Sequence, residues 1–176
     1  AQDIEFTIED GELFILQTRN AKRTAQASVK IAVDMHNEKI LSKQEAVNMI
    51  DADQITSVLH PQFVDSVSKE LFGKGLNASP GAAVGEIVFD AEKAEIEAAR
   101  GKKAILVRDE TSPEDISGMF TSVGILTTKG GMTSHAAVVA RGMGKPCIVG
   151  AENLKIDKDE RKISNGQITI EEGDLI

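Results

Sequence analysis

The stretch VGILTTKGGMTSHAAVVAR, residues 123–141, decides the fold of the C-terminal half of this chain. Residues 123–128 are apolar and rich in β-branched side chains, which predicts a buried strand. Residues 129–131 (Lys-Gly-Gly) end that run, because glycine takes the backbone angles that a tight strand-to-helix turn needs. The small apolar residues at 136–140 then predict a helix that packs closely on a sheet. A strand followed by such a helix is typical of an α/β domain.

One histidine, His135, lies at the start of the predicted helix, directly after Thr133 and Ser134, either of which can cap it. Unpaired backbone N–H groups and the positive end of the helix dipole meet at such a terminus and favour a bound phosphate. A neutral imidazole there can attack a phosphorus atom. The alternative is a polar histidine that only satisfies its hydrogen bonds in a common type of loop, and composition alone leaves both open.

The other histidines and the single cysteine lack such a setting. His36 falls in a helical pattern and His60 precedes a proline, and neither has ligands or nucleophiles beside it in the sequence. Cys147 lies in an apolar run, so we expect a buried small hydrophobe. Arg141 falls on another face of the helix from His135, and a structural role and a docking role both stay open. No cluster of His, Cys and Asp has metal-ligand spacing, so the sequence predicts no metal site built by this chain alone.

The composition limits the classes of partner. The 176 residues allow one domain, or one domain with attached pieces, and carry a net charge of −8, which argues against nucleic acid and anionic membranes. No segment approaches the roughly 18 apolar residues of a membrane span, and no signal peptide opens the chain. A single cysteine cannot form an internal disulfide, which favours a cytoplasmic location. Because the sequence starts with Ala1 inside a strand-like segment, we expect a fragment of a longer protein.

Two regions precede the predicted α/β domain. Residues 1–19 alternate apolar and polar side chains around a turn at residues 9–12, which predicts a hairpin. Because a lone hairpin is barely stable in water, we expect it to be the edge of a larger sheet. Residues 20–73 have a helical pattern, with a capping box at residues 42–45 and a further turn opened by Pro61.

Residues 74–176 are predicted to form the compact α/β domain. After a glycine-punctuated opening, the expected elements are strand 86–89, helix 91–100, strand 104–107, a short helix begun by 111–114, strand 123–128, the His135 helix, strand 147–149 and a hairpin over 162–170 that turns at Asn165-Gly166. For residues 111–114 the main interpretation is a plain helix start, and a place in the frame of the histidine pocket is the alternative. Hairpin and crossover connections together indicate layers of sheet and helix rather than a bundle.

Two parts of the sequence resemble a known family. Residues 130–141 fit every position of the phosphorylation-site signature of the phosphoenolpyruvate-utilising enzymes, and residues 133–150 look most like the pyruvate, phosphate dikinases among them. Residues 3–6 (DIEF) and 16–19 (LQTR) resemble the closing hairpin of the ATP-grasp domain that precedes the phosphohistidine domain in those dikinases. The resemblance implies three parts, which are a terminal ATP-grasp hairpin at 1–19, a helical linker at 20–73 and a swivelling β/β/α phosphohistidine domain at 74–176.

The resemblance also implies roles for individual residues, with His135 as the phosphorylated one. The residues implied to surround its phosphoryl group are Gly130, Gly131, Thr133 and Ser134. The residues implied to lie at the ATP site are Asp3, Glu5, Gln17 and Arg19, for which ordinary surface charge is the alternative. Mg2+ is implied as the cofactor of the full enzyme, held mainly outside this sequence, with Asp3 and Glu5 as its candidate ligands here. We also expect Gly131 to take the special backbone angles of the turn, with neighbouring Gly130 as the alternative.

In the pyruvate, phosphate dikinases the β-phosphoryl group of ATP moves to the histidine. This reaction gives AMP and, after attack on inorganic phosphate, pyrophosphate. The domain then swings to a barrel, where pyruvate takes the group and becomes phosphoenolpyruvate. The resemblance thus implies ATP, phosphate and pyruvate as substrates, the ATP-grasp and barrel domains of the same chain as partners, a homodimeric full enzyme and a fragment inactive by itself. The alternatives are phosphoenolpyruvate synthase, which uses water in place of phosphate, and a non-catalytic docking module of the same fold. In plant dikinases the residue that resembles Thr133 is a regulatory phosphorylation target, and the sequence leaves open whether Thr133 is one.

Overall fold

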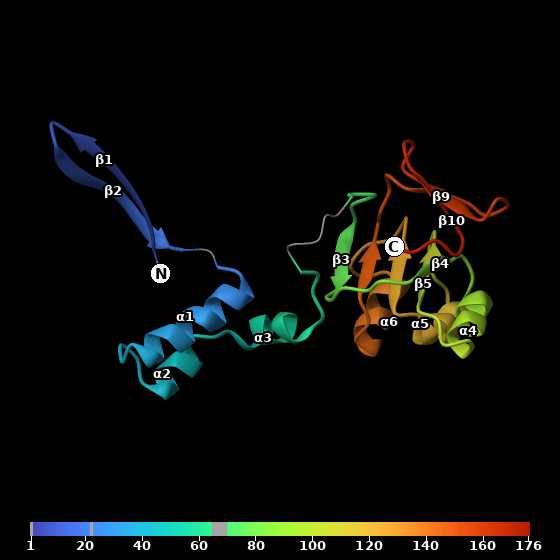
Figure 1. Ribbon diagram of the computed structural model, residues 1–176, viewed down its shortest axis with the longest axis horizontal. Coiled ribbons are helices and arrows are strands. Elements are labelled where there is room, and N and C mark those ends of the chain that lie inside the picture. The colour runs from blue at the N-terminus through green and yellow to red at the C-terminus, as the bar shows by residue number, and fades with distance from the viewer. Residues whose placement is uncertain (1, 22, 65–69) are drawn as a thin grey trace. The chain divides into compact units, whose positions relative to one another are not determined.

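The computed structural model describes residues 2–21, 23–64 and 70–176 (Figure 1). The chain divides into two compact units, Ala1–Leu59 and His60–Ile176. This boundary differs from the linker end predicted at residue 73, because Phe72 belongs to the second unit. Its ring packs against the apolar cluster of that unit, and its carbonyl oxygen accepts a hydrogen bond of 3.0 Å from Asn165 Nδ2.

The first unit contains the predicted hairpin, formed by β1 (Gln2–Glu9) and β2 (Glu12–Asn20). Asp10 and Gly11 connect the strands with φ angles of 50° and 86°, the left-handed pair that a tight hairpin turn requires. The register shifts between Glu5 and Phe6, so that Glu5 pairs with Gln17 while Phe6 pairs with Ile15. One face therefore gathers exposed apolar side chains, which are Ile4, Phe6, Ile8, Leu13 and Ile15.

The helices of the first unit are α1 (Ala25–Asn37), α2 (Lys43–Asn48) and α3 (Ala52–Leu59), and α1 contacts the other two. The predicted capping box is confirmed, because Glu45 N donates to Ser42 Oγ at 3.3 Å and Ser42 N donates to Glu45 Oε2 at 2.9 Å. In the described residues 60–64 and 70–75 no further helix follows, whereas a helical pattern was predicted to residue 73. The predicted pattern over residues 65–69 lies outside the described residues.

The second unit is built on a five-stranded sheet with the order β3-β7-β6-β5-β4. Four strands run parallel and β3 lies antiparallel at one edge, beside β7. The strands are β3 (Leu76–Ser79), β4 (Glu86–Val88), β5 (Ala104–Arg108), β6 (Gly124–Thr127) and β7 (Cys147–Val149). The helices are α4 (Ala91–Ala99), α5 (Ile116–Thr121), preceded by a 3-10 turn at Pro113–Asp115, and α6 (His135–Met143). A smaller antiparallel sheet comprises β8 (Lys155–Asp157), β9 (Lys162–Ser164) and β10 (Thr169–Glu171).

The elements of the second unit form three layers, because apolar side chains along the strands face the two sides of the sheet in turn. On one face Val88 and Leu106 belong to the apolar cluster shared with the helices, and on the other face Ile87 and Val107 belong to the cluster that contains Ile163 of β9. Figure 1 shows α4, α5 and α6 gathered on one side of the unit, with β9 and β10 on the other. The predicted α/β fold class is confirmed, as layers of antiparallel sheet, parallel sheet and helices.

The carboxyl ends of β5 and β6 meet at one edge of the sheet, and this edge positions the candidate site. Two backbone hydrogen bonds join the loops that leave these strands, from Thr128 N to Arg108 O at 3.1 Å and from Lys129 N to Asp109 O at 3.0 Å. Ligands of open parallel sheets bind at this kind of edge. The loops lead to residues 110–112 on one side and to the turn before His135 on the other.

A close contact between α4 and α5 gives a first testable prediction. A Cβ atom at Gly118 would lie 2.4 Å from Ala91 Cα, which is backbone and cannot move without shifting α4. We expect Gly118→Ala to lower the free energy of unfolding by roughly 1–3 kcal/mol, as overpacking does. Gly142→Ala is the matched control, because its Cβ meets no other group within 4 Å and alanine favours a helix. Urea denaturation measures both, and equal midpoints for Gly118→Ala and the unaltered chain would contradict the packing argument.

Candidate functional site

His135 is the first residue of α6, as predicted. Ser134 is the N-cap, with φ −64° and ψ 160°, and its Oγ accepts a hydrogen bond of 3.4 Å from Ala137 N. Of the two capping residues that the sequence allows, the structure therefore uses Ser134, while Thr133 is exposed. The histidine lies on the first turn, where backbone N–H groups have no helical partner and the helix dipole is positive.

A buried threonine orients the imidazole. Thr111 Oγ1 lies 2.9 Å from His135 Nδ1, and Thr111 is 9% exposed. When Nδ1 carries the proton and donates it to Thr111, the lone pair of Nε2 is available for attack. The residues from 111 onward do start a short helical turn, as predicted. Of residues 111–114, Thr111 alone also lines the cavity beside His135.

His135 opens onto a cavity of about 200 Å³ at the carboxyl edge of the sheet. Its lining residues come from the ends of β5 and β6, the glycine turn and the start of α6, and they are Glu110, Thr111, Thr127, Lys129, Gly130, Ser134, His135 and Ala136. Of the residues predicted to surround a phosphoryl group, the cavity brings Gly130 and Ser134 to His135. Gly131 and Thr133 do not line it. The sequence analysis missed Glu110 and Lys129, whose signal was their position in the loops that follow the predicted strands 104–107 and 123–128.

The glycine turn before α6 depends on Gly130 rather than Gly131. Gly130 has a φ angle of +90°, and a Cβ there would lie 2.9 Å from Ser134 Cβ. The expectation that Gly131 takes the special angles is wrong, because its φ lies outside the left-handed region and a Cβ would meet nothing within 4 Å. Two adjacent glycines look alike in a sequence, and only the backbone path tells them apart.

This difference gives a second prediction. We expect Gly130→Ala to slow phosphorylation of His135 and to lower stability by about 1–3 kcal/mol, because alanine at this φ is strained and displaces the cap. Gly131→Ala is the control and is expected to keep both the rate and the thermal midpoint. Incorporation of labelled phosphate, followed together with circular dichroism melting, separates a displaced histidine from an unfolded chain. A normal rate in folded Gly130→Ala would contradict this assignment.

Arg141 of α6 and Cys147 of β7 have structural roles. Arg141 Nε donates to Ala137 O at 3.1 Å and its Nη2 donates to Met132 O at 2.5 Å, so the guanidinium fastens the turn onto the helix. Of the two roles that the sequence left open for Arg141, these contacts support the structural one. Cys147 is 1% exposed, and burial raises the pKa of its thiol to about 11, so it stays protonated at neutral pH. The prediction of a buried small hydrophobe is confirmed.

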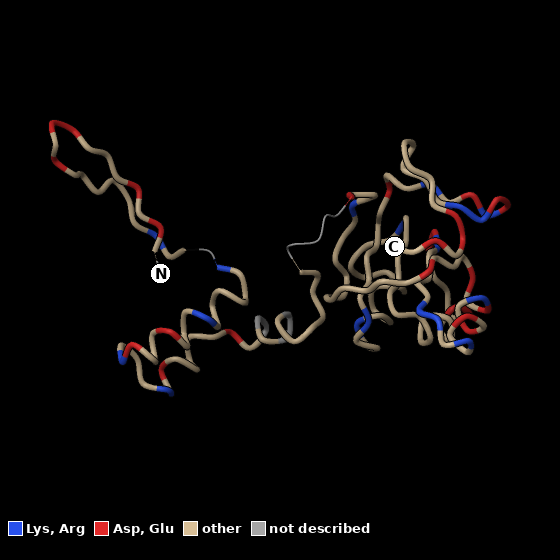
Figure 2. The backbone as a smooth tube through the Cα atoms, viewed as in Figure 1, with Lys and Arg blue, Asp and Glu red and all other residues tan. Residues whose placement is uncertain are grey.

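The hairpin collects the predicted nucleotide-site residues on one face. Asp3 pairs with Arg19 across the strands and Glu5 pairs with Gln17, so all four side chains project from the same side. Arg19 Nε lies 3.3 Å from Asp3 Oδ2, and Arg19 Nη2 lies 4.0 Å from Glu5 Oε1. Figure 2 shows acidic and basic positions close together at the open end of the hairpin. These residues belong to a different compact unit from His135.

The hairpin is the place in the described part of the chain where the sequence predicted ligands for a metal ion. Within the described residues no group of three or more His, Cys, Asp and Glu side chains is arranged to hold a metal. Asp3 and Glu5 share one face and could supply two oxygen ligands. Mg2+ is commonly held by one or two carboxylates, with phosphate oxygens and water completing its octahedron. The hairpin therefore fits part of a magnesium–nucleotide site.

Comparison with known proteins gives the family. Residues 100–175, which include β5, β6, the glycine turn and α6, match the mobile domain of the PEP-utilising enzymes. Over these residues the chain is similar to that mobile domain. The resemblance seen in the sequence is thereby confirmed.

Individual PEP-utilising relatives match far more than the mobile domain. The chain is 54% identical over 175 residues to the pyruvate, phosphate dikinase of Rhizobium meliloti, a match that covers 99% of this chain and 20% of that protein. It is 54% identical over 178 residues to the pyruvate, phosphate dikinase of Rickettsia prowazekii, and 50% identical over 176 residues to the chloroplastic pyruvate, phosphate dikinase 1 of Arabidopsis thaliana. The chain spans about a fifth of the length of these relatives. Every helix in the described residues is too short or too polar to cross a membrane.

Proposed function

We propose that this chain carries a phosphoryl group on His135 Nε2 within a pyruvate, phosphate dikinase. The observation that carries the proposal is the hydrogen bond of 2.9 Å between Thr111 Oγ1 and His135 Nδ1, at the start of α6 and beside a cavity of about 200 Å³. A nucleophile needs a free lone pair, a held orientation and a place for the group that it receives. In the tautomer that donates Nδ1–H to Thr111, His135 has all three at this edge of the sheet.

The chemistry of the transfer follows from these contacts. The lone pair of Nε2 attacks phosphorus, the new N–P bond forms, and the bond from phosphorus to the donor oxygen breaks with its electron pair leaving on that oxygen. Positive charge grows on the imidazole, and the Nδ1–H bond to Thr111 disperses it. Backbone N–H groups of the first turn of α6 stabilise the phosphoryl oxygens. Transfer to an acceptor reverses these steps.

The full cycle is proposed from the relatives, which are named pyruvate, phosphate dikinase. In it His135 takes the β-phosphoryl group of ATP, with phosphate converted to pyrophosphate, and gives the group to pyruvate to form phosphoenolpyruvate. The hairpin residues Asp3, Glu5, Gln17 and Arg19 contribute to the nucleotide site. Mg2+, when bound there, neutralises the phosphate oxygens. The pyruvate site and the rest of the nucleotide site belong to other parts of the dikinase, which we propose to be a cytoplasmic homodimer, and the phosphohistidine unit swivels between them.

One experiment tests the proposal directly. The parent dikinase is incubated with labelled phosphoenolpyruvate, and the expected product is acid-labile, base-stable phosphate on the peptide that contains His135. Release of pyrophosphate in the ATP half-reaction supports the dikinase, while release of inorganic phosphate would instead indicate the synthase reaction. Failure of His135 to take up phosphate would leave only a docking module of this fold.

A further inference from the structure

The cavity beside His135 carries two ionisable side chains that the sequence signature does not include, Lys129 and Glu110. Lys129 follows β6 and Glu110 follows β5, so the two approach the cavity from adjacent strand ends. Among the described residues that line this cavity, Lys129 supplies the positive side chain besides the titratable histidine itself. We propose that the Lys129 ammonium binds the phosphoryl oxygens on His135, and that the Glu110 carboxylate opposes their charge and favours release.

The backbone of Lys129 is fixed on three sides. Its N–H donates to Asp109 O at 3.0 Å, and its carbonyl oxygen accepts from Thr127 Oγ1 at 2.7 Å and from Gly150 N at 3.3 Å. The side chain is exposed at the mouth of the cavity. A fixed backbone with a flexible charged end suits a residue that must reach a phosphoryl group and then let it go.

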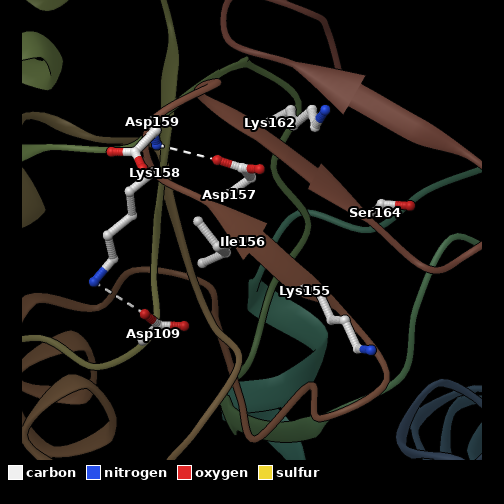
Figure 3. Close-up of a pocket in the computed structure, with 8 residues that line it drawn as sticks. All are labelled: Asp109, Lys155, Ile156, Asp157, Lys158, Asp159, Lys162 and Ser164. Atoms are coloured by element: carbon white, nitrogen blue, oxygen red, sulfur yellow. Dashed lines mark hydrogen bonds and ion pairs between the residues drawn. The ribbon is translucent and has the colours of Figure 1, made fainter.

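One carboxylate in the loops near Lys129, that of Asp109, is occupied by other groups. Asp109 binds Lys158 Nζ at 3.0 Å and Thr128 Oγ1 at 3.0 Å, and Figure 3 shows the Lys158 chain reaching Asp109. Burial acts to raise the pKa of Asp109, but the contacts from Lys158 and Thr128 and the nearby charge of Lys129 outweigh it, so the net pKa is lowered. Asp109 therefore stays ionised and paired at neutral pH. The described ion pairs include none to Lys129, which leaves its ammonium available to a ligand.

The two charges have opposite effects on the phosphorylated state. A phosphoryl group brings negative charge into a partly enclosed site, where a nearby ammonium stabilises it and a carboxylate raises its free energy. A carrier must accept the group and also surrender it, so neither charge alone serves both steps. This inference rests on the proposed function, because it assigns roles only if His135 is phosphorylated.

The test uses this chain with phosphoramidate as a chemical phosphoryl donor, so that no other domain is needed. Nε2 of neutral His135 attacks phosphorus, the N–P bond to the ring forms, and the P–N bond of the donor breaks with its electron pair leaving as ammonia. Intact mass and phosphorus NMR follow uptake, and the loss of phosphate after removal of the donor gives the hydrolysis rate. His135→Asn reports any uptake at other residues.

The variants separate charge from structure. We expect Lys129→Met to slow uptake about tenfold, as loss of a charged hydrogen bond does, with Lys129→Arg restoring most of the rate. Lys155→Met is the matched control, since Lys155 is exposed and lines a different groove (Figure 3). Glu110→Gln is expected to slow hydrolysis of the phosphohistidine about threefold. Melting curves check that each variant is folded.

The outcomes distinguish this inference from the proposed function. Uptake by the unaltered chain with equal rates in Lys129→Met and Lys155→Met would overturn the role of Lys129 and keep His135 as the carrier. Faster or unchanged hydrolysis in Glu110→Gln would overturn the role of Glu110. No uptake by the unaltered chain, or undiminished uptake by His135→Asn, would overturn the proposed function itself.

Discussion

Replacing His135 by asparagine is expected to abolish phosphoryl transfer in the parent dikinase while the fold is retained. Asparagine removes the attacking nitrogen but keeps a polar side chain at the start of α6, and Ser134 still caps the helix. Both half-reactions should fall to background, because both use the same nitrogen in the proposed cycle. The measurement is labelled phosphate retained by the purified protein after incubation with phosphoenolpyruvate, alongside circular dichroism.

His36→Asn is the matched control for this variant. His36 lies near the end of α1, and its Nδ1 is 3.1 Å from Leu41 O. Replacing His36 therefore removes one contact beyond the helix and leaves the proposed nucleophile in place. We expect it to retain full phosphate uptake. Retention of label by folded His135→Asn, at a level equal to the control, would exclude His135 as the carrier.

Changes on the polar face of the hairpin are expected to remove one half-reaction and spare the other. Arg19→Met takes away the cation that pairs with Asp3 and Glu5, and Glu5→Gln removes a carboxylate suited to a magnesium–nucleotide complex. In the parent dikinase we expect ATP-dependent labelling of His135 to fall at least about a hundredfold, as loss of a phosphate-stabilising group does at such sites. Exchange between pyruvate and phosphoenolpyruvate should continue at its normal rate, because in the proposed cycle it uses His135 and a distant site.

Glu12→Gln is the matched control for the hairpin. Glu12 begins β2 next to the turn, is exposed, and pairs across the strands with Glu9, another acidic residue. Glu12→Gln removes one negative charge from the hairpin, as Glu5→Gln does. Glu12 lies at the turn, at the opposite end of the hairpin from the pair Asp3 and Arg19. Equal loss of both half-reactions in a folded Arg19→Met variant would show that the hairpin does not act through the nucleotide.

Features that depend on neighbours in the sequence were predictable. The hairpin of β1 and β2, the capping box at Ser42 and the start of α6 at His135 each have a local pattern, and all three are confirmed. The turn at Gly166, with a φ angle of +91°, is likewise local. Local conformational preference and tertiary packing agree at these positions, so the sequence alone is sufficient.

Features that depend on distant partners were not predictable. Strand β8 is short, with the charged Lys155 and Asp157 on either side of Ile156, and it exists because Ile156 pairs with Ile163 of β9. The contact of Thr111 with His135 crosses 24 residues and requires two parallel strands to end at one edge. The predicted linker included Phe72 because its apolar pattern does not say which core receives it. For the first two the missing information is the register of the sheet, and for Phe72 it is the core on which the ring packs.

The bare apolar side of the hairpin has a consequence for handling the protein in solution. Ile4, Phe6 and Ile8 are 51%, 56% and 63% exposed on a ribbon whose edges are also open, which is a template for self-association into β-rich oligomers. His60–Ile176 contains both large apolar clusters and carries none of these side chains. A truncated chain that starts at His60 is therefore suited to spectroscopy at high concentration. Light scattering of the full and the truncated chain would measure how much of the self-association comes from the hairpin.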